Sequence, residues 1–511
     1  MKCSWLKDAI FYEIYPNSFK DSNNDGYGDF LGIISKLDYV KGLGVNAIWL
    51  NPHYDSPFMD GGYDVRDFFK CASRFGTEED FDKLVNECHK RNIHLIVDLV
   101  AGHTSEENEM FLESASPKHN EYSDRFIWTK NPWDCPSEYK FLNGRYNRFG
   151  AYMVNFFSTQ PALNYGFNKI THDWQMSYKD EEPRKTQEFL LSVMRFWLNR
   201  GVDGFRVDLA DSLVKNDDNK EATIEIWKYM ISTIKKDYPD IMLVSEWNNP
   251  YQSLEAGFDA DFVLDMSNNF YNDLSRIEEF NPKVKSFLEA DSVFDIREDL
   301  KKTIKMINDN KDKGFLSFIT CNHDTVRSSY YLDEKELRLF NFVVLTLPGV
   351  PFIYYGDELG MKYQDDIDSV ECGYARTGSR TPFPWIDNKN QGFSPLESTK
   401  PFLQVDYSTS LFKQENDDKS LLNLTKKLIK LRNEDNNLKG NDICYFETND
   451  SRLLAYYRNN DLIIVNPTLN AKNIKLDYDS KILFKDGTAE INNKIISIGG
   501  QSAVVVSIKN V

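Results

Sequence analysis

The chain has 511 residues, of which 41% are hydrophobic. This length exceeds what one hydrophobic core supports, so we expect two or three domains. The net charge of −18 disfavours a nucleic acid or an anionic membrane as the main partner and fits a neutral substrate better. Seven scattered cysteines without a CxxC pair, and an N-terminus without signal-peptide features, predict a cytoplasmic protein.

The first part of the chain alternates apolar, β-rich runs with amphipathic segments. Strands are predicted at residues 9–15, 45–50 and 93–100, and helices at residues 32–43 and 78–91, with Thr77 as an N-cap. From residue 104 to residue 171 the sequence is rich in Tyr, Asn, Pro and Trp and has no clear period. A structureless loop of that length is rare in a compact domain, so we predict a small subdomain inserted after the third strand.

The alternation resumes after this insertion. Further strands are predicted at residues 204–208, 242–246, 262–266, 315–320 and 351–355, and helices at residues 186–199, 222–237, 298–308, 334–345 and 421–432. Eight strands, most of them followed by a helix, predict an α/β fold, a (β/α)8 TIM barrel built from residues 1–103 and 172–438. The short alternating strands that follow predict a C-terminal antiparallel β-sandwich domain at residues 439–511. The most apolar stretch, residues 342–355, is too short to span a bilayer.

Charged residues gather where the predicted barrel strands end, which is where barrels of this type carry their functional groups. They are Asp98, His103, Arg206, Asp208, Glu246, His323 and Asp324. Glycoside hydrolysis needs two carboxyl groups flanking the scissile bond, and three carboxylates from strands four, five and seven converge here. Arg206 lies two residues before Asp208, so both side chains point to one side of the strand, where the guanidinium would keep a nucleophile ionised. A single Asp at a strand end is more often a turn former or helix cap, but the combination indicates an active site.

Five segments, in order along nearly the whole chain, resemble the conserved segments of the α-amylase superfamily of glycoside hydrolases (family 13), especially its oligo-α-glucosidase branch. They are residues 98–103 (DLVAGH), 160–164 (QPALN), 204–208 (GFRVD), 245–247 (SEW) and 320–324 (TCNHD). The resemblance implies Asp208 as nucleophile, Glu246 as general acid/base and Asp324 as a third catalytic carboxylate. It also implies substrate contacts from Tyr63, Asp64, His103, Arg206, His323 and Arg380. For Arg380 a structural salt bridge is the alternative.

Residues 21–29 (DSNNDGYGD) form a loop whose side chains suit a hard cation. Oxygen-bearing residues at loop positions 1, 3, 5 and 9, with glycine at position 6, follow the order of an EF-hand, but position 12 is Gly32 instead of the bidentate glutamate. The loop alone is also typical of a metal-free Asn/Asp turn. Oligo-α-glucosidases carry a similar calcium loop after the first strand. The resemblance therefore implies one structural Ca²⁺, held by Asp21, Asn23, Asp25, Asp29 and the Tyr27 carbonyl.

The resemblance implies cleavage of α-linked gluco-oligosaccharides by double displacement with retention. We expect an exo-acting α-glucosidase on malto- or isomalto-oligosaccharides. An endo-acting α-amylase or an α-glucan transglycosylase is the alternative, and a catalytically silent carbohydrate-binding or scaffold barrel is the hypothesis from another class. Three departures from the family pattern, at Gly102, Ala162 and Leu209, leave the preferred linkage open. Relatives usually have Asn at the Gly102 position, which ligates calcium in many amylases, so no second calcium site is expected.

Overall fold

Eight parallel strands form the centre of the protein. The computed structural model describes residues 3–263, 269–395 and 409–508. The strands are β1 (Phe11–Ile14), β2 (Ala47–Leu50), β5 (His94–Val100), β8 (Gly204–Asp208), β9 (Met242–Ser245), β10 (Ala260–Phe262), β11 (Phe315–Ser317) and β12 (Phe352–Tyr354). Their order is β11-β10-β9-β8-β5-β2-β1-β12, and a parallel bridge between Ile319 and Phe352 joins the two ends. The predicted (β/α)8 barrel is confirmed.

The sixth strand differs from its predicted position. We expected residues 262–266, but β10 begins two residues earlier, and residues 264–266 lie outside the described part of the chain. The added residues bring a charged side chain into the strand, and Asp261, like Asp259 just before the strand, is buried and paired. Lys235 Nζ lies 2.6 Å from Asp259 Oδ1, and Ser245 Oγ donates to Asp261 Oδ1 over 2.6 Å. Satisfied in this way, the two carboxylates fit inside the sheet.

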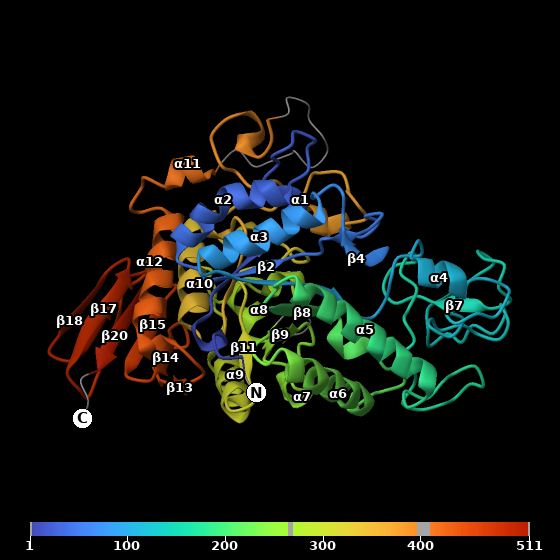
Figure 1. Ribbon diagram of the computed structural model, residues 1–511. Coiled ribbons are helices and arrows are strands. Elements are labelled where there is room, and N and C mark those ends of the chain that lie inside the picture. The colour runs from blue at the N-terminus through green and yellow to red at the C-terminus, as the bar shows by residue number, and fades with distance from the viewer. Residues whose placement is uncertain (1–2, 264–268, 396–408, 509–511) are drawn as a thin grey trace.

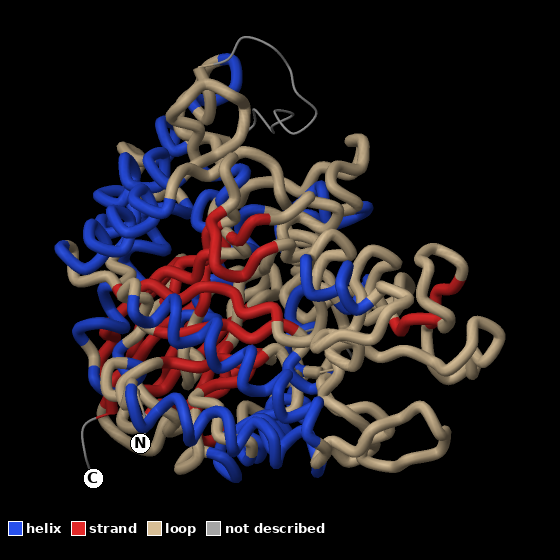
Figure 2. The backbone as a smooth tube through the Cα atoms, turned by 45° about the vertical axis from the view of Figure 1, so that its right-hand side comes forward, coloured by secondary structure: helices blue, strands red, loops and turns tan. Residues whose placement is uncertain are grey.

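Helices cover the outside of the barrel, whose strands occupy the middle of the molecule (Figure 2). The main ones are α2 (Phe30–Leu43), α3 (Glu78–Lys90), α5 (Glu181–Asn199), α6 (Glu221–Asp237), α9 (Arg297–Asn310), α10 (Glu334–Thr346) and α12 (Leu421–Glu434). Thr77 caps α3 as predicted, because its side chain accepts from Asp80 N and the Asp80 carboxylate accepts from Thr77 N. Two short helices, α7 (Pro250–Glu255) and α8 (Phe270–Ser275), were not predicted. No helix in the described ranges is long and apolar enough to cross a membrane.

The segment between β5 and α5 projects from one side of the barrel (Figure 1). It contains α4 (Glu109–Ser114) and the antiparallel pair β6 (Phe141–Asn143) and β7 (Ala151–Met153). A small separate core holds it together, formed by Ile127, Met153, Ala162, Phe167 and Trp174. An insertion after the third barrel strand is therefore present, and it brings its own side chains toward the barrel mouth.

The C-terminal part forms two antiparallel sheets on the other side of the barrel (Figure 1). The larger sheet has the order β13-β14-β15-β20-β17 and the smaller one β16-β19-β18. Their strands are β13 (Cys444–Tyr445), β14 (Leu454–Arg458), β15 (Asp461–Asn466), β16 (Lys472–Lys475), β17 (Ser480–Asp486), β18 (Ala489–Asn492), β19 (Ile495–Ile498) and β20 (Ser502–Ile508). One face of the larger sheet, including Tyr456 and Val505, belongs to the main core.

A buried arginine joins this β domain to the barrel. Arg458, on β14, is fully buried, and its guanidinium donates to the carbonyl oxygens of Thr346, Leu438, Gly440 and Asp442 over 2.6 to 3.0 Å. Thr346 is the last residue of α10, so the arginine satisfies a carbonyl at the end of a barrel helix.

Candidate active site

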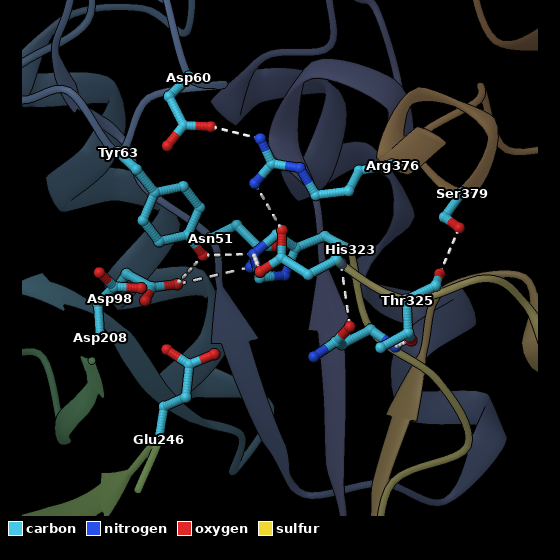
Figure 3. Close-up of polar contacts among 12 residues, drawn as sticks. Asn51, Asp60, Tyr63, Asp98, Asp208, Glu246, His323, Thr325, Arg376 and Ser379 are labelled. Atoms are coloured by element: carbon cyan, nitrogen blue, oxygen red, sulfur yellow. Dashed lines mark hydrogen bonds and ion pairs between the residues drawn. The ribbon is translucent and has the colours of Figure 1, made fainter. Parts of the chain in front are cut away.

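The predicted site residues come from neighbouring strands and lie at one end of the barrel. Asp98 pairs in register with Arg206 on the adjacent strand, and Asp208 follows two residues later on β8. Glu246 comes directly after β9, and Asp324 lies in the segment after β11. Figure 3 shows Glu246 directed toward Asp208 and Asp98. The parallel strands thus bring together the three carboxylates predicted from the sequence.

Arg206 is the centre of this cluster. Its Nη1 lies 2.6 Å from Asp98 Oδ1 and 2.9 Å from Asp208 Oδ1, and its Nη2 lies 2.9 Å from Glu246 Oε2. The guanidinium is 1% exposed, whereas the side chains of Asp208 and Glu246 are 10% and 18% exposed. One buried cation therefore positions three carboxylates, and Asp208 and Glu246 keep only a small exposed area.

The pKa of Asp208 moves in the direction opposite to our expectation. Burial raises it; Arg206 opposes this, but the carboxylates of Glu246, Asp98 and Asp324 raise it further, and the net pKa lies well above its usual value. We expected the guanidinium to keep Asp208 ionised, and this expectation is wrong. Arg206 does lower the pKa, but burial and the neighbouring carboxylates together raise it by more. The cluster therefore favours the protonated form of Asp208, which must lose this proton before it can act as a nucleophile.

Asp324 has the opposite environment. Its Oδ2 lies 2.9 Å from His323 Nε2, and its Oδ1 lies 3.1 Å from Arg376 Nη1 and 2.8 Å from Arg380 Nη2. Burial works against ionisation, but His323, Arg380 and Arg376 hold the pKa of Asp324 well below its usual value. Burial likewise lowers the pKa of His323, yet Asp324 and Glu13 raise it to about 9. An imidazolium and two guanidinium groups thus hold one ionised carboxylate, which is 29% exposed.

Tyr63 joins the two groups of charges. Its hydroxyl lies 2.6 Å from His323 Nε2 and 3.2 Å from Asp98 Oδ2, and its ring stacks on the His323 ring at 5.2 Å. His103 contacts Tyr63 through the backbone, because His103 Nε2 lies 3.1 Å from the Tyr63 carbonyl oxygen. Substrate contact by Tyr63 and His103 stays a prediction.

Asp64 does not join the cluster. Its carboxylate accepts from Ser56 Oγ and from the backbone N–H groups of Met59 and Asp60, over 2.8 to 3.0 Å. It shapes the loop of the β3–β4 hairpin (Tyr54–Asp55 and Asp67–Cys71) and is fully buried. Its burial also raises its pKa to about 6. We expected Asp64 beneath the sugar, and the structure places it in support of the loop instead.

Asp60 and Arg376 were not predicted from the sequence. Arg376 Nη2 lies 2.8 Å from Asp60 Oδ1, while its Nη1 contacts Asp324 (Figure 3). Gln160 Nε2 donates to Asp60 Oδ2 over 2.8 Å, and the Arg376 guanidinium lies 5.5 Å from the centre of the Phe157 ring. Three loops therefore meet on one side of the site. Two signals were available: Gln160 belongs to the QPALN segment, and Arg376 lies four residues before Arg380.

The predicted calcium loop is held mainly by its own hydrogen bonds. The Asp21 carboxylate accepts from the N–H groups of Asn23, Asn24 and Gly26 and from Ser394 Oγ. The Asp29 side chain caps α2 through Gly32 N. Among the described residues no group of three or more His, Cys, Asp or Glu side chains is arranged to hold a metal ion. Asn23 Nδ2 donates a hydrogen bond to Asp25 Oδ2 over 3.2 Å. Calcium binding by this loop stays a prediction.

Comparisons with known proteins found a matching family model, similar sequences and similar solved structures. The family model "Alpha amylase, catalytic domain" matches residues 13–441. "Alpha-amylase 3" of Dictyoglomus thermophilum is 32% identical, covering 99% of this chain and 94% of that protein. "Oligo-1,6-glucosidase" of Parageobacillus thermoglucosidasius is 31% identical over 96% of this chain and 95% of its own length. Among solved structures, a mutant isomaltulose synthase from Erwinia rhapontici NX5, in complex with its natural substrate sucrose, aligns with a TM-score of 0.82 at 26% identity, covering 99% of each chain.

Proposed function

Because this chain belongs to the α-amylase family of glycoside hydrolases, we propose that it is a retaining exo-α-glucosidase on short malto- or isomalto-oligosaccharides. The observation that carries the proposal is the arrangement around Arg206, which positions Asp208 and Glu246 through its two terminal nitrogen atoms. Asp208 and Glu246, both held by this guanidinium at one end of the barrel, can supply the nucleophile and the acid that double displacement requires on either side of the scissile bond.

In this mechanism Glu246 donates a proton to the glycosidic oxygen while Asp208 attacks the anomeric carbon. The C1–O bond breaks, the leaving sugar departs with the proton, and a glycosyl ester forms on Asp208. Glu246 then removes a proton from water, whose oxygen attacks C1 and releases Asp208, so that the configuration is retained. Asp324, ionised and held by His323, stabilises the positive charge that develops on the sugar ring.

Three contacts support exo action. Arg376 joins Asp60 and Asp324, and it lies against the ring of Phe157 from the inserted segment. These contacts connect three loops across one side of the site, an arrangement that suits a substrate whose non-reducing end stops there. Tyr63 and Arg380 would hold the hydroxyl groups of that terminal glucose.

A second candidate is a transglycosylase, in which a sugar hydroxyl replaces water in the second step. It is favoured by the similarity to isomaltulose synthase structures over nearly the whole chain. Both candidates use the same two carboxyl groups, so the acceptor distinguishes them.

The test is the product pattern of purified protein on maltotriose, isomaltotriose, sucrose and soluble starch, with the anomeric form followed by NMR. Release of α-glucose from one trisaccharide is the expected result and gives the linkage at once. Isomerised or elongated products would support the transglycosylase. Activity mainly on starch would overturn exo action, and release of β-glucose would overturn the retaining mechanism.

A further inference from the structure

A chain of three side chains connects the loop after β8 with His103. Lys215, seven residues beyond Asp208, places its Nζ 3.3 Å from Asn155 Oδ1 and 2.6 Å from the Ser212 carbonyl oxygen. The Nδ2 of Asn155 lies 3.1 Å from His103 Nδ1. On the other side of the ring, Nε2 lies 3.1 Å from the Tyr63 carbonyl. The chain thus joins the β8 loop, the inserted segment and the loop that carries Tyr63.

The chemistry of the two ends fixes the proton on the ring between them. A lysine ammonium only donates, so the Asn155 amide must turn Oδ1 toward Lys215 and Nδ2 toward His103. Nδ1 of His103 then faces an N–H donor and has to accept. A backbone carbonyl only accepts, so Nε2 must carry the hydrogen. Both ends require the same neutral tautomer, and an imidazolium would place two donors against each other.

Burial supports the same assignment. His103 is 1% exposed, and burial, with a smaller contribution from the Lys215 charge, lowers its pKa to about 4. The ring is therefore neutral at the pH values at which glycosidases are assayed. This direction agrees with the hydrogen-bond argument, which stands without it.

Gly102 leaves room for the amide. A Cβ atom at this position would lie 2.9 Å from Asn155 Nδ2, closer than carbon and nitrogen atoms pack, and 3.8 Å from Leu213 Cδ2. The nearest obstacle is the end of a side chain, so a methyl group here would displace the amide rather than the backbone. Gly102→Ala is therefore a steric probe that leaves His103, Asn155 and Lys215 chemically unchanged.

We propose that Lys215 and Asn155 are positioning residues that hold His103 as the Nε2–H tautomer and thereby fix the Tyr63 backbone next to the catalytic carboxylates. Tyr63 contacts His323 and Asp98 through its hydroxyl, so a shift of its backbone moves a group at the centre of the site. The loop after β8, which begins at Asp208, thus also sets the position of Tyr63.

The test is the tautomer of His103, read by 15N NMR at pH 7 in protein labelled at its seven histidines. The His103 signals are assigned by their loss in His103→Gln. The wild type should show a protonated Nε2 and an unprotonated Nδ1. Lys215→Met frees the amide to turn, and Gly102→Ala displaces it, so both variants should give mixed tautomers. Lys215→Arg keeps a cation that only donates and should retain the wild-type signals.

A kinetic measurement accompanies the spectra, and this part rests on the proposed function. Lys215→Met and Gly102→Ala should raise KM about tenfold with a smaller change in kcat, because Tyr63 is displaced while the carboxylates remain. Lys215→Arg should restore the wild-type KM. Near-UV circular dichroism verifies that each variant is folded.

Two results would overturn the proposal: a protonated Nδ1 in the wild type, or unchanged His103 signals in folded Lys215→Met and Gly102→Ala. The tautomer is measured without substrate, so failure of the proposed glucosidase activity leaves this result interpretable. Asn155→Asp supplies a further check. A carboxylate accepts from both neighbours, so this variant should stabilise a proton on Nδ1 and produce the imidazolium.

Discussion

Replacing Asp208 by Asn is expected to abolish turnover and, at neutral pH, to raise the melting temperature. Loss of the nucleophile should lower kcat by about 10⁴-fold or more. The gain in stability follows from the raised pKa of Asp208. A carboxyl group whose pKa is higher in the folded than in the unfolded protein makes folding less favourable at any pH above its unfolded pKa of about 4, and this cost vanishes below that pH.

The magnitude comes from the charges around Arg206. Three carboxylates contact one guanidinium, so the group has a formal charge of −2 when all are ionised, and Asp208→Asn reduces it to −1 while Oδ1 still accepts from Arg206. We expect a gain of about 0.5–2 kcal/mol, the usual range for one stabilising substitution. An unfolding entropy of about 2 cal/mol/K per residue converts this into a rise of about 0.5–2 °C for 511 residues.

The matched control is Asp98→Asn. Asp98 accepts from Trp49 Nε1, Tyr63 OH and Arg206 Nη1, so an amide here turns a donor toward donors and should cost about 1–3 kcal/mol. Scanning calorimetry at pH 7 and pH 4 checks both variants. The reasoning is refuted if Asp208→Asn melts below the wild type at pH 7, or if its advantage persists unchanged at pH 4.

Three further predictions concern the surroundings of the carboxylates. The pKa of His323 is raised to about 9, so its ion pair with Asp324 is present below that pH. Both kcat/KM and the melting temperature should therefore fall as the pH rises through about 9. The melting temperature of His323→Gln should not show this fall. Arg376→Gln should raise KM about tenfold in steady-state assays, since it separates Asp60 from Asp324; an unchanged KM would contradict this. A chelator should lower the melting temperature and Ca²⁺ should restore it, whereas Asp25→Ala should show neither effect; a chelator without effect on the wild type would count against the calcium loop.

The sequence predicted the barrel and its three carboxylates because both depend on local signals. Alternating strands and helices have a readable period, and a residue at the end of a parallel strand is placed by the strand itself. Asp208 needed no further information, since β8 has the predicted bounds.

What could not be predicted depends on how loops fold back over the barrel. Asp60 and Arg376 are 316 positions apart, and no periodicity connects them. Asp64 was assigned to the substrate by the family resemblance, but neighbouring residues in a loop point in different directions, and only the loop conformation decides which of them faces the site. The prediction for the pKa of Asp208 was wrong for a similar reason. Arg206 is the nearest charged residue in the sequence, but in the folded protein it is one of several charges around Asp208.

The buried Arg458 makes the C-terminal β domain part of the stability of the catalytic barrel. Its four carbonyl partners include that of Thr346, at the end of α10. The face of β14 and β20 that carries Tyr456 and Val505 is part of the main hydrophobic core. A barrel without these strands would expose that core and leave buried carbonyl groups without donors. The two parts should therefore melt in a single calorimetric transition, and a fragment ending before β14 should not fold into an active enzyme.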